Sequence, residues 1–167
     1  MKLRTPILTI IVLGVVAFAT YTAFFSSNPA PAVTFTSLKG EKVSTADLRG
    51  HVVLVNFWAT DCPACVKEMP HMVTTYNKYQ KAGLELVAVA MRHDPPNYVI
   101  NYTEKNALPF RVALDPMGQL AKAFGEVKLT PTTIVIDKRG NIVTRILGEP
   151  DFAKLHALIE QKLAEPV

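Results

Sequence analysis

The pattern of apolar and polar positions divides the chain into two parts. Residues 7–25 form an unbroken apolar run without a charged side chain, close to the roughly 20 residues that a helix needs to cross a bilayer. Lys2 and Arg4 precede this run, so the positive-inside bias predicts that residues 1–6 are cytoplasmic. We expect an uncleaved transmembrane anchor at 7–25, because a signal-peptide core usually has only about 7–15 apolar residues. A cleaved signal peptide, with the sequence APA at 30–32 as its cleavage site, is the alternative.

After this run, the pattern is that of a globular domain. Residues 26–32 (SSNPAPA) have the composition of a short linker, and residues 33–167 have the size of one ordinary domain. Continuous apolar runs at 52–57 and 84–91 are typical of strands that are covered on both faces. Strands are predicted at 33–35, 41–43, 52–57, 84–91, 111–114, 132–136 and 142–147, and helices at 62–81, 97–106, 119–124 and 152–163.

The order of these elements predicts the fold class. Strands alternate with helices, and a hairpin with its turn at 137–141 and a final amphipathic helix follow. This order predicts an α/β domain with a central mixed sheet and helices on both faces. Pro70 lies inside the first long predicted helix, and we expect it to kink or break that helix.

Charge changes this picture little. The chain has 18 Lys and Arg against 14 Asp and Glu, and two of the basic residues, Lys2 and Arg4, precede the apolar run. The domain therefore keeps 16 basic and 14 acidic residues, a net charge of +2. No Lys/Arg cluster interleaved with aromatic residues is present, so we expect no nucleic-acid partner.

The candidate chemistry lies in the only two cysteines. Cys62 and Cys65 form a C-x-x-C directly after the apolar strand at 52–57, an arrangement typical of a redox dithiol. The start of a helix exposes unpaired N–H groups and the positive end of the helix dipole, and both stabilise a thiolate. A structural disulfide is the weaker interpretation, because closing so short a loop adds little stability.

The residues around the dithiol resemble a known family. The segments VNFWATDCPAC at 55–65, EMP at 68–70 and TPTT at 130–133 resemble the membrane-anchored TlpA/ResA group of the thioredoxin superfamily, which includes the cytochrome c maturation thioredoxins. The resemblance extends over residues 33–163. It implies a thioredoxin fold with an N-terminal β-hairpin and a central insert around 92–110.

Positions on the predicted helix suggest roles for three residues. Cys62 at the helix tip should be the exposed nucleophile, and Cys65, one turn inward, should resolve the mixed disulfide. Glu68 occupies the position of the buried glutamate that is usual in the group, whereas Asn56 stands where ordinary thioredoxins carry a buried aspartate. If Glu68 is buried, its pKa is raised and it can exchange protons with Cys65. A solvated helix glutamate is the alternative.

Four further residues are candidates for contact with a client protein. The resemblance implies that Pro131 is a cis proline facing the dithiol and that the backbone of Thr130 pairs with the client strand. Trp58 is either a core residue or a lid beside the sulfurs. Asp61 stands where the superfamily usually has tryptophan. Its negative charge should disfavour a Cys62 thiolate and make the dithiol reducing.

The resulting hypothesis is a membrane-tethered thiol–disulfide oxidoreductase. The resemblance implies a bacterial inner-membrane location with the domain on the periplasmic or outer side, and a transmembrane electron donor of the CcdA/DsbD type. It also implies that the enzyme reduces disulfides of exported clients such as apocytochrome c or copper-site assembly proteins. A periplasmic disulfide oxidase or isomerase, and a Cu(I)-binding module that uses both thiolates, are the alternatives.

We expect no cofactor beyond the redox-active Cys62–Cys65 disulfide. No metal site is expected, because the histidines are not spaced as zinc ligands with the C-x-x-C. His71 and His156 are predicted on helix surfaces and His93 in a solvated loop. The four histidines considered are His51, His71, His93 and His156.

Overall fold

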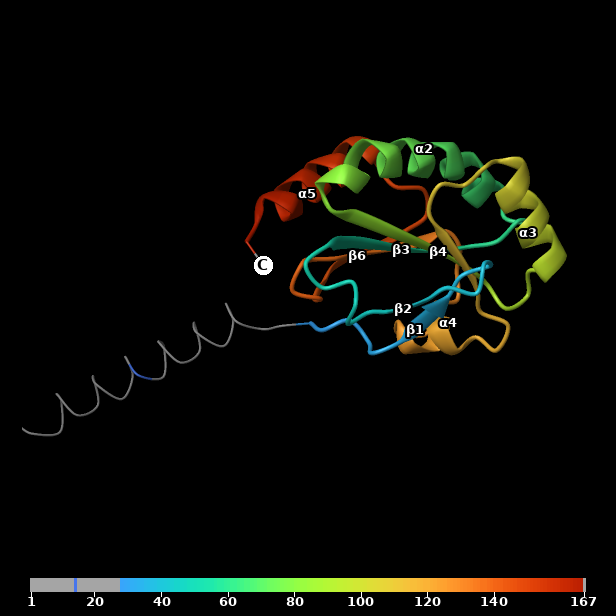
Figure 1. Ribbon diagram of the computed structural model, residues 1–167, viewed down its shortest axis with the longest axis horizontal. Coiled ribbons are helices and arrows are strands. Elements are labelled where there is room, and N and C mark those ends of the chain that lie inside the picture. The colour runs from blue at the N-terminus through green and yellow to red at the C-terminus, as the bar shows by residue number, and fades with distance from the viewer. Residues whose placement is uncertain (1–13, 15–27, 167) are drawn as a thin grey trace, which may run out of the picture.

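The computed structural model describes residue 14 and residues 28–166 (Figure 1). The predicted cytoplasmic segment at 1–6 and, except for residue 14, the predicted anchor at 7–25 lie outside the described residues. The predicted linker is described from residue 28 onward. No helix within the described part is long and apolar enough to span a membrane.

A mixed sheet forms the centre of the domain. Its strands are arranged in the order β5-β4-β3-β6-β7. The three strands β5, β4 and β3 are parallel, whereas β6 is antiparallel to both of its neighbours. The strands are β3 (Val52–Trp58), β4 (Leu84–Ala90), β5 (Arg111–Leu114), β6 (Thr132–Ile136) and β7 (Ile142–Leu147).

Helices and a hairpin cover the two faces of this sheet. Helices α2 and α5 lie across one face with α3 at its side, whereas α4 and the β1–β2 hairpin lie on the other face (Figure 1). The helices are α2 (Pro63–Tyr79), α3 (Pro96–Lys105), α4 (Gln119–Ala123) and α5 (Phe152–Ala164), a 3-10 turn follows α2 at Gln80–Ala82, and the hairpin pairs β1 (Thr34–Thr36) with β2 (Lys42–Ser44).

The strand β3 has buried side chains on both of its faces. Leu54 and Trp58 belong to the apolar cluster under α2 and α5, whereas Val55 and Phe57 belong to the cluster under α4 and the hairpin. Successive side chains of a strand point to opposite faces. Asn56 therefore lies on the same face as Leu54 and Trp58, beneath α2, in a largely apolar layer.

The predicted mixed sheet, the helices on both of its faces and the N-terminal hairpin are confirmed, and the segment at 92–110 contains α3. Of the two outcomes expected at Pro70, a kink or a break, the break is wrong, because α2 continues through Pro70 to Tyr79. Proline removes one hydrogen bond from a helix. The side chains of Met69 and Met72 are buried on either side of it, and their packing holds both halves of α2 on the sheet.

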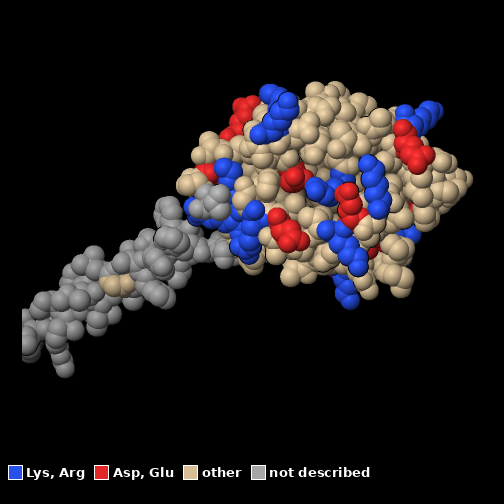
Figure 2. Space-filling model, viewed as in Figure 1, with Lys and Arg blue, Asp and Glu red and all other residues tan. Residues whose placement is uncertain are grey.

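Charged side chains of both signs are interspersed on the face of the molecule shown in Figure 2. This surface carries no large area of a single sign. The distribution agrees with the small net charge that the sequence gives for the domain.

The burial of β3 predicts how a substitution in this strand changes the free energy of unfolding. Leu54→Ala should lower the free energy of unfolding by about 2–5 kcal/mol, because the Leu54 side chain is fully buried and its loss leaves a cavity. Leu147→Ala is the matched control, since Leu147 is 62% exposed, and it should cost no more than about 0.5 kcal/mol. Urea unfolding of the oxidised proteins, followed by the fluorescence of the single tryptophan, measures both values. Equal losses in the two variants would contradict this account of the core.

Candidate active site

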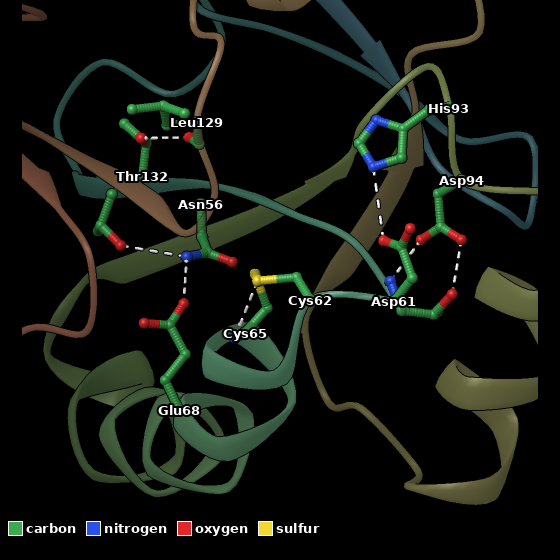
Figure 3. Close-up of a disulfide and its surroundings, with 11 residues drawn as sticks. Asn56, Asp61, Cys62, Cys65, Glu68, His93, Asp94, Leu129 and Thr132 are labelled. Atoms are coloured by element: carbon green, nitrogen blue, oxygen red, sulfur yellow. Dashed lines mark hydrogen bonds and ion pairs between the residues drawn. A yellow bond between two sulfur atoms is a disulfide. The ribbon is translucent and has the colours of Figure 1, made fainter.

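The two cysteines lie at the junction between β3 and α2 and form a disulfide (Figure 3). Cys62 is the N-cap of α2, and its Sγ accepts a hydrogen bond from the backbone N–H of Cys65 at 3.2 Å. The first four N–H groups of a helix have no partner within the helix. One of them is thus directed at the Cys62 sulfur, where it would stabilise a thiolate in the reduced protein.

The two sulfurs differ in their access to solvent. Cys62 is partly exposed, whereas Cys65 is fully buried and belongs to the apolar cluster beneath α2. A disulfide of a large client can therefore approach Cys62 and not Cys65. This asymmetry agrees with the order of attack that the sequence predicts.

A buried carboxyl group lies one helical turn beyond Cys65. Glu68 is fully buried, so the predicted burial is confirmed. Its Oε1 accepts a hydrogen bond from Asn56 Nδ2 at 2.8 Å, and within the described structure its Oε2 has no partner. Burial raises the pKa of Glu68 to about 7, with a further rise from the charge of Glu149, and the hydrogen bond from Asn56 opposes both effects. The carboxyl group can therefore gain or lose a proton near neutral pH.

Asn56 connects this carboxyl group to the disulfide. Its Nδ2 also donates to the Oγ1 of Thr133 on β6 at 3.1 Å. Its Oδ1 has no partner among the described residues and points toward the two sulfurs in Figure 3. Asn56 thus lies between Glu68 and the disulfide, inside the apolar layer.

The loops that follow β3 and β4 hold the exposed rim of the site. Asp61 is exposed, and its Oδ1 lies 3.5 Å from Nε2 of His93, which is itself half exposed. The prediction of a solvated loop position for His93 is confirmed, and the loop adjoins the dithiol. Asp94 is buried and accepts hydrogen bonds of 2.6 Å from both the backbone N–H and the hydroxyl of Thr60.

Asp94 was not among the residues selected from the sequence. One signal in the sequence could have indicated its contact with Thr60. Asp94 follows β4 and Thr60 follows β3, and the carboxyl ends of adjacent parallel strands lie side by side. These two hydrogen bonds hold the segment before Cys62 against the neighbouring loop. They therefore fix the position from which α2 begins.

The Thr130–Pro131 peptide bond is cis, as the resemblance implies. Pairing of Thr132 with Phe57 places this peptide opposite the end of β3, where the loop to Cys62 begins. Pro131 accepts a hydrogen bond from the backbone of Gly148, whereas Thr130 forms no backbone hydrogen bond within residues 28–166. Thr130 is partly exposed, so its unpaired backbone is available to an added strand.

Trp58 is a core residue, and its proposed contact with clients is corrected. Its side chain is fully buried, and its ring centroid lies 5.2 Å from that of Tyr102 on α3. The physical reason is the alternation of β3, which directs this side chain beneath α2 and α3 rather than into the loop. Of the two alternatives considered from the sequence, the structure supports the core position.

The other histidines lie away from the dithiol rim. His71 is exposed on α2, as predicted, whereas His156 is partly buried because its Nε2 lies 2.8 Å from the hydroxyl of Thr75. Among residues 28–166, no three Cys, His, Asp or Glu side chains are grouped as metal ligands would be.

A cleft of about 500 Å³ opens beside the rim. One wall is the loop that carries Arg92 and His93, and the other includes Lys122 on α4 and Lys128, two residues before Thr130. Met91 and Val127 provide apolar surface in the cleft. Both walls are thus continuous in sequence with the segments that border the dithiol.

The sheet, the dithiol at a strand–helix junction and the cis proline define a thiol–disulfide oxidoreductase with a thioredoxin-like fold. The Redoxin family model matches residues 25–159, and the chain belongs to this family. It is similar to the thiol-disulfide oxidoreductase ResA of Bacillus cereus, with 34% identity over 93% of this chain and 92% of the relative.

Two further comparisons agree with this assignment. ResA of Geobacillus kaustophilus is 36% identical over 87% of this chain and 86% of its own length. The crystal structure of a thioredoxin-family thiol:disulfide interchange protein from Chlorobium tepidum matches with a TM-score of 0.76 and 29% identity. It covers 83% of this chain and 98% of that one. The predicted family, fold and enzyme class are therefore confirmed.

The buried carboxyl group predicts a pH dependence of stability. Because the pKa of Glu68 is about 7 in the folded protein, against 4.5 as its ordinary value, the folded state binds a proton that the unfolded state releases between these pH values. The contribution of Glu68 to the free energy of unfolding must then fall as pH rises through this window, by about 3 kcal/mol in total. Glu68→Gln removes this contribution, so the oxidised variant should lose less stability than the wild type between pH 5 and pH 8.

Denaturant unfolding at a series of pH values measures this difference. Glu126→Gln is the control, because Glu126 is exposed and its substitution should leave the wild-type pH profile unchanged. Parallel profiles for the wild type and Glu68→Gln would show that the Glu68 carboxyl group does not titrate as described.

Proposed function

We propose that this protein is a membrane-tethered reductase that transfers electrons to disulfides of exported proteins. The observation that carries the proposal is the arrangement of three groups along the first turns of α2. A partly exposed sulfur at the N-cap is followed by a buried sulfur and then by a buried carboxyl group that titrates near neutral pH.

In the first step, the Cys62 thiolate attacks one sulfur of the client disulfide. A bond forms between Cys62 and that sulfur, the client S–S bond breaks, and the second client sulfur leaves with the bonding electron pair and takes up a proton. The N–H of Cys65, which is directed at Cys62 Sγ, stabilises the attacking thiolate.

In the second step, Cys65 resolves the mixed disulfide. Its thiol transfers a proton to the Glu68 carboxylate, and the resulting thiolate attacks Cys62 Sγ. The Cys62–Cys65 disulfide forms, and the first client sulfur leaves as a thiolate that is then protonated. The client has gained two electrons and the enzyme has lost two, which a second dithiol must restore by the reverse exchange.

Client binding would use the segment beside the dithiol. The free backbone of Thr130 can pair with an extended client segment, which is the usual mode of strand addition at an open edge. Pro131 would place that segment opposite the end of β3. Side chains that flank the client cysteine would then reach the cleft between His93 and Lys128.

Membrane attachment and location are supported by the sequence. The apolar run at 7–25 after two basic residues favours an anchor with the domain on the outer side of a bacterial inner membrane. The resemblance to the TlpA/ResA group favours a transmembrane donor of the CcdA/DsbD type. It also favours apocytochrome c or copper-site assembly proteins as clients, and the Cys62–Cys65 dithiol serves as the only redox group.

Asp61 supports reduction of the client rather than its oxidation. Its exposed carboxylate precedes Cys62, and a negative charge there disfavours the thiolate and with it the reduced form. His93 offsets this charge only when it is protonated.

The two-step exchange predicts opposite behaviour of two serine variants. Cys65→Ser should accumulate a mixed disulfide with a client peptide, because the resolving sulfur is absent, whereas Cys62→Ser should form none. Both variants should lose at least about a hundredfold in disulfide reduction, since either lacks one of the two sulfurs that complete the exchange. Non-reducing electrophoresis and mass spectrometry detect the adduct. Wild-type turnover by Cys62→Ser, or equal trapping by both variants, would refute the proposal.

The charge of Asp61 predicts a change in reduction potential. Asp61→Asn should raise the potential by roughly 5–20 mV, the range expected for loss of one solvent-screened charge. Glu41→Gln removes an exposed charge on the hairpin side and should leave the potential unchanged. Equilibration with glutathione or dithiothreitol buffers gives the values. A wild-type potential close to that of the strong periplasmic oxidants would rule out a reductase.

A further inference from the structure

We propose that Asn56 is a positioning residue for proton exchange between Cys65 and Glu68, and that its side-chain amide turns to present its NH₂ group to whichever of the two is the anion. The inference rests on the proposed function and deepens it. It assigns a role to a fully buried side chain that the two-step exchange does not otherwise require.

The first observation is that the network is incomplete on the side of the sulfurs. Asn56 Oδ1, which points toward the sulfurs in Figure 3, is buried and has no hydrogen-bond partner in the described structure. Buried polar atoms are nearly always paired, because leaving them unpaired costs the free energy of their lost hydration. The disulfide next to Asn56 carries no hydrogen. Reduction adds a proton to Cys65 and supplies a donor on that side.

The second observation is the geometry of the amide. The NH₂ group of Asn56 donates to Glu68 and to Thr133, and Figure 3 shows the Oδ1 atom directed at the sulfurs. Asn56 lies on the central strand and Glu68 on α2 above it, so neither backbone need move for the amide to rotate about its last side-chain bond. Thr133 fits both orientations, because a hydroxyl group can accept from the amide nitrogen or donate to the amide oxygen.

One orientation suits the state in which Glu68 is ionised. The amide then donates from Nδ2 to the carboxylate at 2.8 Å, as observed, and its Oδ1 can accept from the thiol of Cys65 once the disulfide is reduced. The amide nitrogen then has Glu68 as its acceptor, and the amide oxygen has the Cys65 thiol as its donor.

The reversed orientation suits the state after proton transfer. The S–H bond of Cys65 breaks and an O–H bond forms on Glu68, so the negative charge moves from the carboxyl group to the sulfur. The turned amide accepts the new O–H with Oδ1 and donates from Nδ2 to the thiolate. Since Cys65 is fully buried and water cannot solvate its thiolate, an N–H turned toward the sulfur would replace the missing hydration.

Asn56→Leu tests the proposal, since leucine has a similar size and cannot donate a hydrogen bond. The variant is made in the full chain, in mild detergent, with Cys62→Ser so that Cys65 is the only thiol. The midpoint of thiolate formation, followed by ultraviolet absorbance, should rise by about one pH unit, which is a tenfold loss of thiolate at a given pH. Because Cys65 and Glu68 are coupled, this midpoint belongs to the pair.

Thr75→Val is the matched control for loss of a buried polar group from the same layer. Thr75 is fully buried on α2, and its hydroxyl contacts His71 and His156 rather than the sulfurs. Its variant should titrate as the parent does. An unchanged midpoint in Asn56→Leu, or equal shifts in the two variants, would overturn the proposal.

A second measurement uses the wild type and does not depend on the folding of a variant. The side-chain NH₂ resonances of Asn56 in the reduced protein should shift as the Cys65 thiolate forms, because the acceptor of the NH₂ group changes from a Glu68 oxygen to the Cys65 sulfur. The NH₂ group of Asn106, which donates to the Tyr102 carbonyl at the surface, should not follow that titration. Asn56 resonances that remain fixed through the titration would exclude rotation of the amide.

The outcomes separate this proposal from the one on which it rests. If Cys65→Ser still traps the client while the Asn56 measurements show no effect, the dithiol exchange stands and the role of Asn56 is wrong. If Cys65→Ser traps no client peptide, the exchange itself is wrong and the role of Asn56 is lost with it.

Discussion

Burial of β3 on both faces is the constraint on which the rest of the structure depends. Helix α2 covers one face of this strand, and α4 and the hairpin cover the other. The chain can therefore leave the core only at the carboxyl end of β3. The helix that follows must then begin at the rim of the sheet and pass back over its face. Cys62 is consequently at the surface and Cys65 inside, so one short turn provides both an accessible and a protected sulfur.

The same two periodicities bring the polar groups together. Cys65 and Glu68 are three residues apart on α2 and therefore lie on nearly the same side of the helix. Leu54 and Asn56 are two residues apart on β3 and therefore lie on the same face of the strand, beneath α2. Both polar side chains are therefore enclosed in a largely apolar layer. Burial gives the carboxyl group of Glu68 a pKa near neutrality. It also strengthens the hydrogen bond to this group, because the surroundings have a low dielectric constant.

Features that depend on local spacing could be predicted from the sequence. The apolar runs predicted the central strands and the C-x-x-C predicted the dithiol, whereas burial of Glu68 was implied by the resemblance to the TlpA/ResA group and not by spacing alone. The contacts of Asp94 with Thr60 and of His93 with Asp61 join loops more than thirty residues apart in sequence, and no local pattern encodes them. The burial of Trp58 required the packing of α3, and the continuity of α2 through Pro70 required the packing of its neighbours.

The site thus combines a solvent-exposed rim with an interior that is shielded from water. The two regions act on different parts of the proposed thiol–disulfide exchange. Asp61 and His93 are solvated, so the charge of the Asp61 carboxylate is screened and can adjust the stability of the Cys62 thiolate only modestly. Glu68 and Asn56 are shielded from water, and in the proposed exchange they determine where the proton of Cys65 can go. Because the two sulfurs have different surroundings, the proposed exchange implies that substitutions at the rim can alter the driving force of client reduction while proton transfer in the resolving step is preserved.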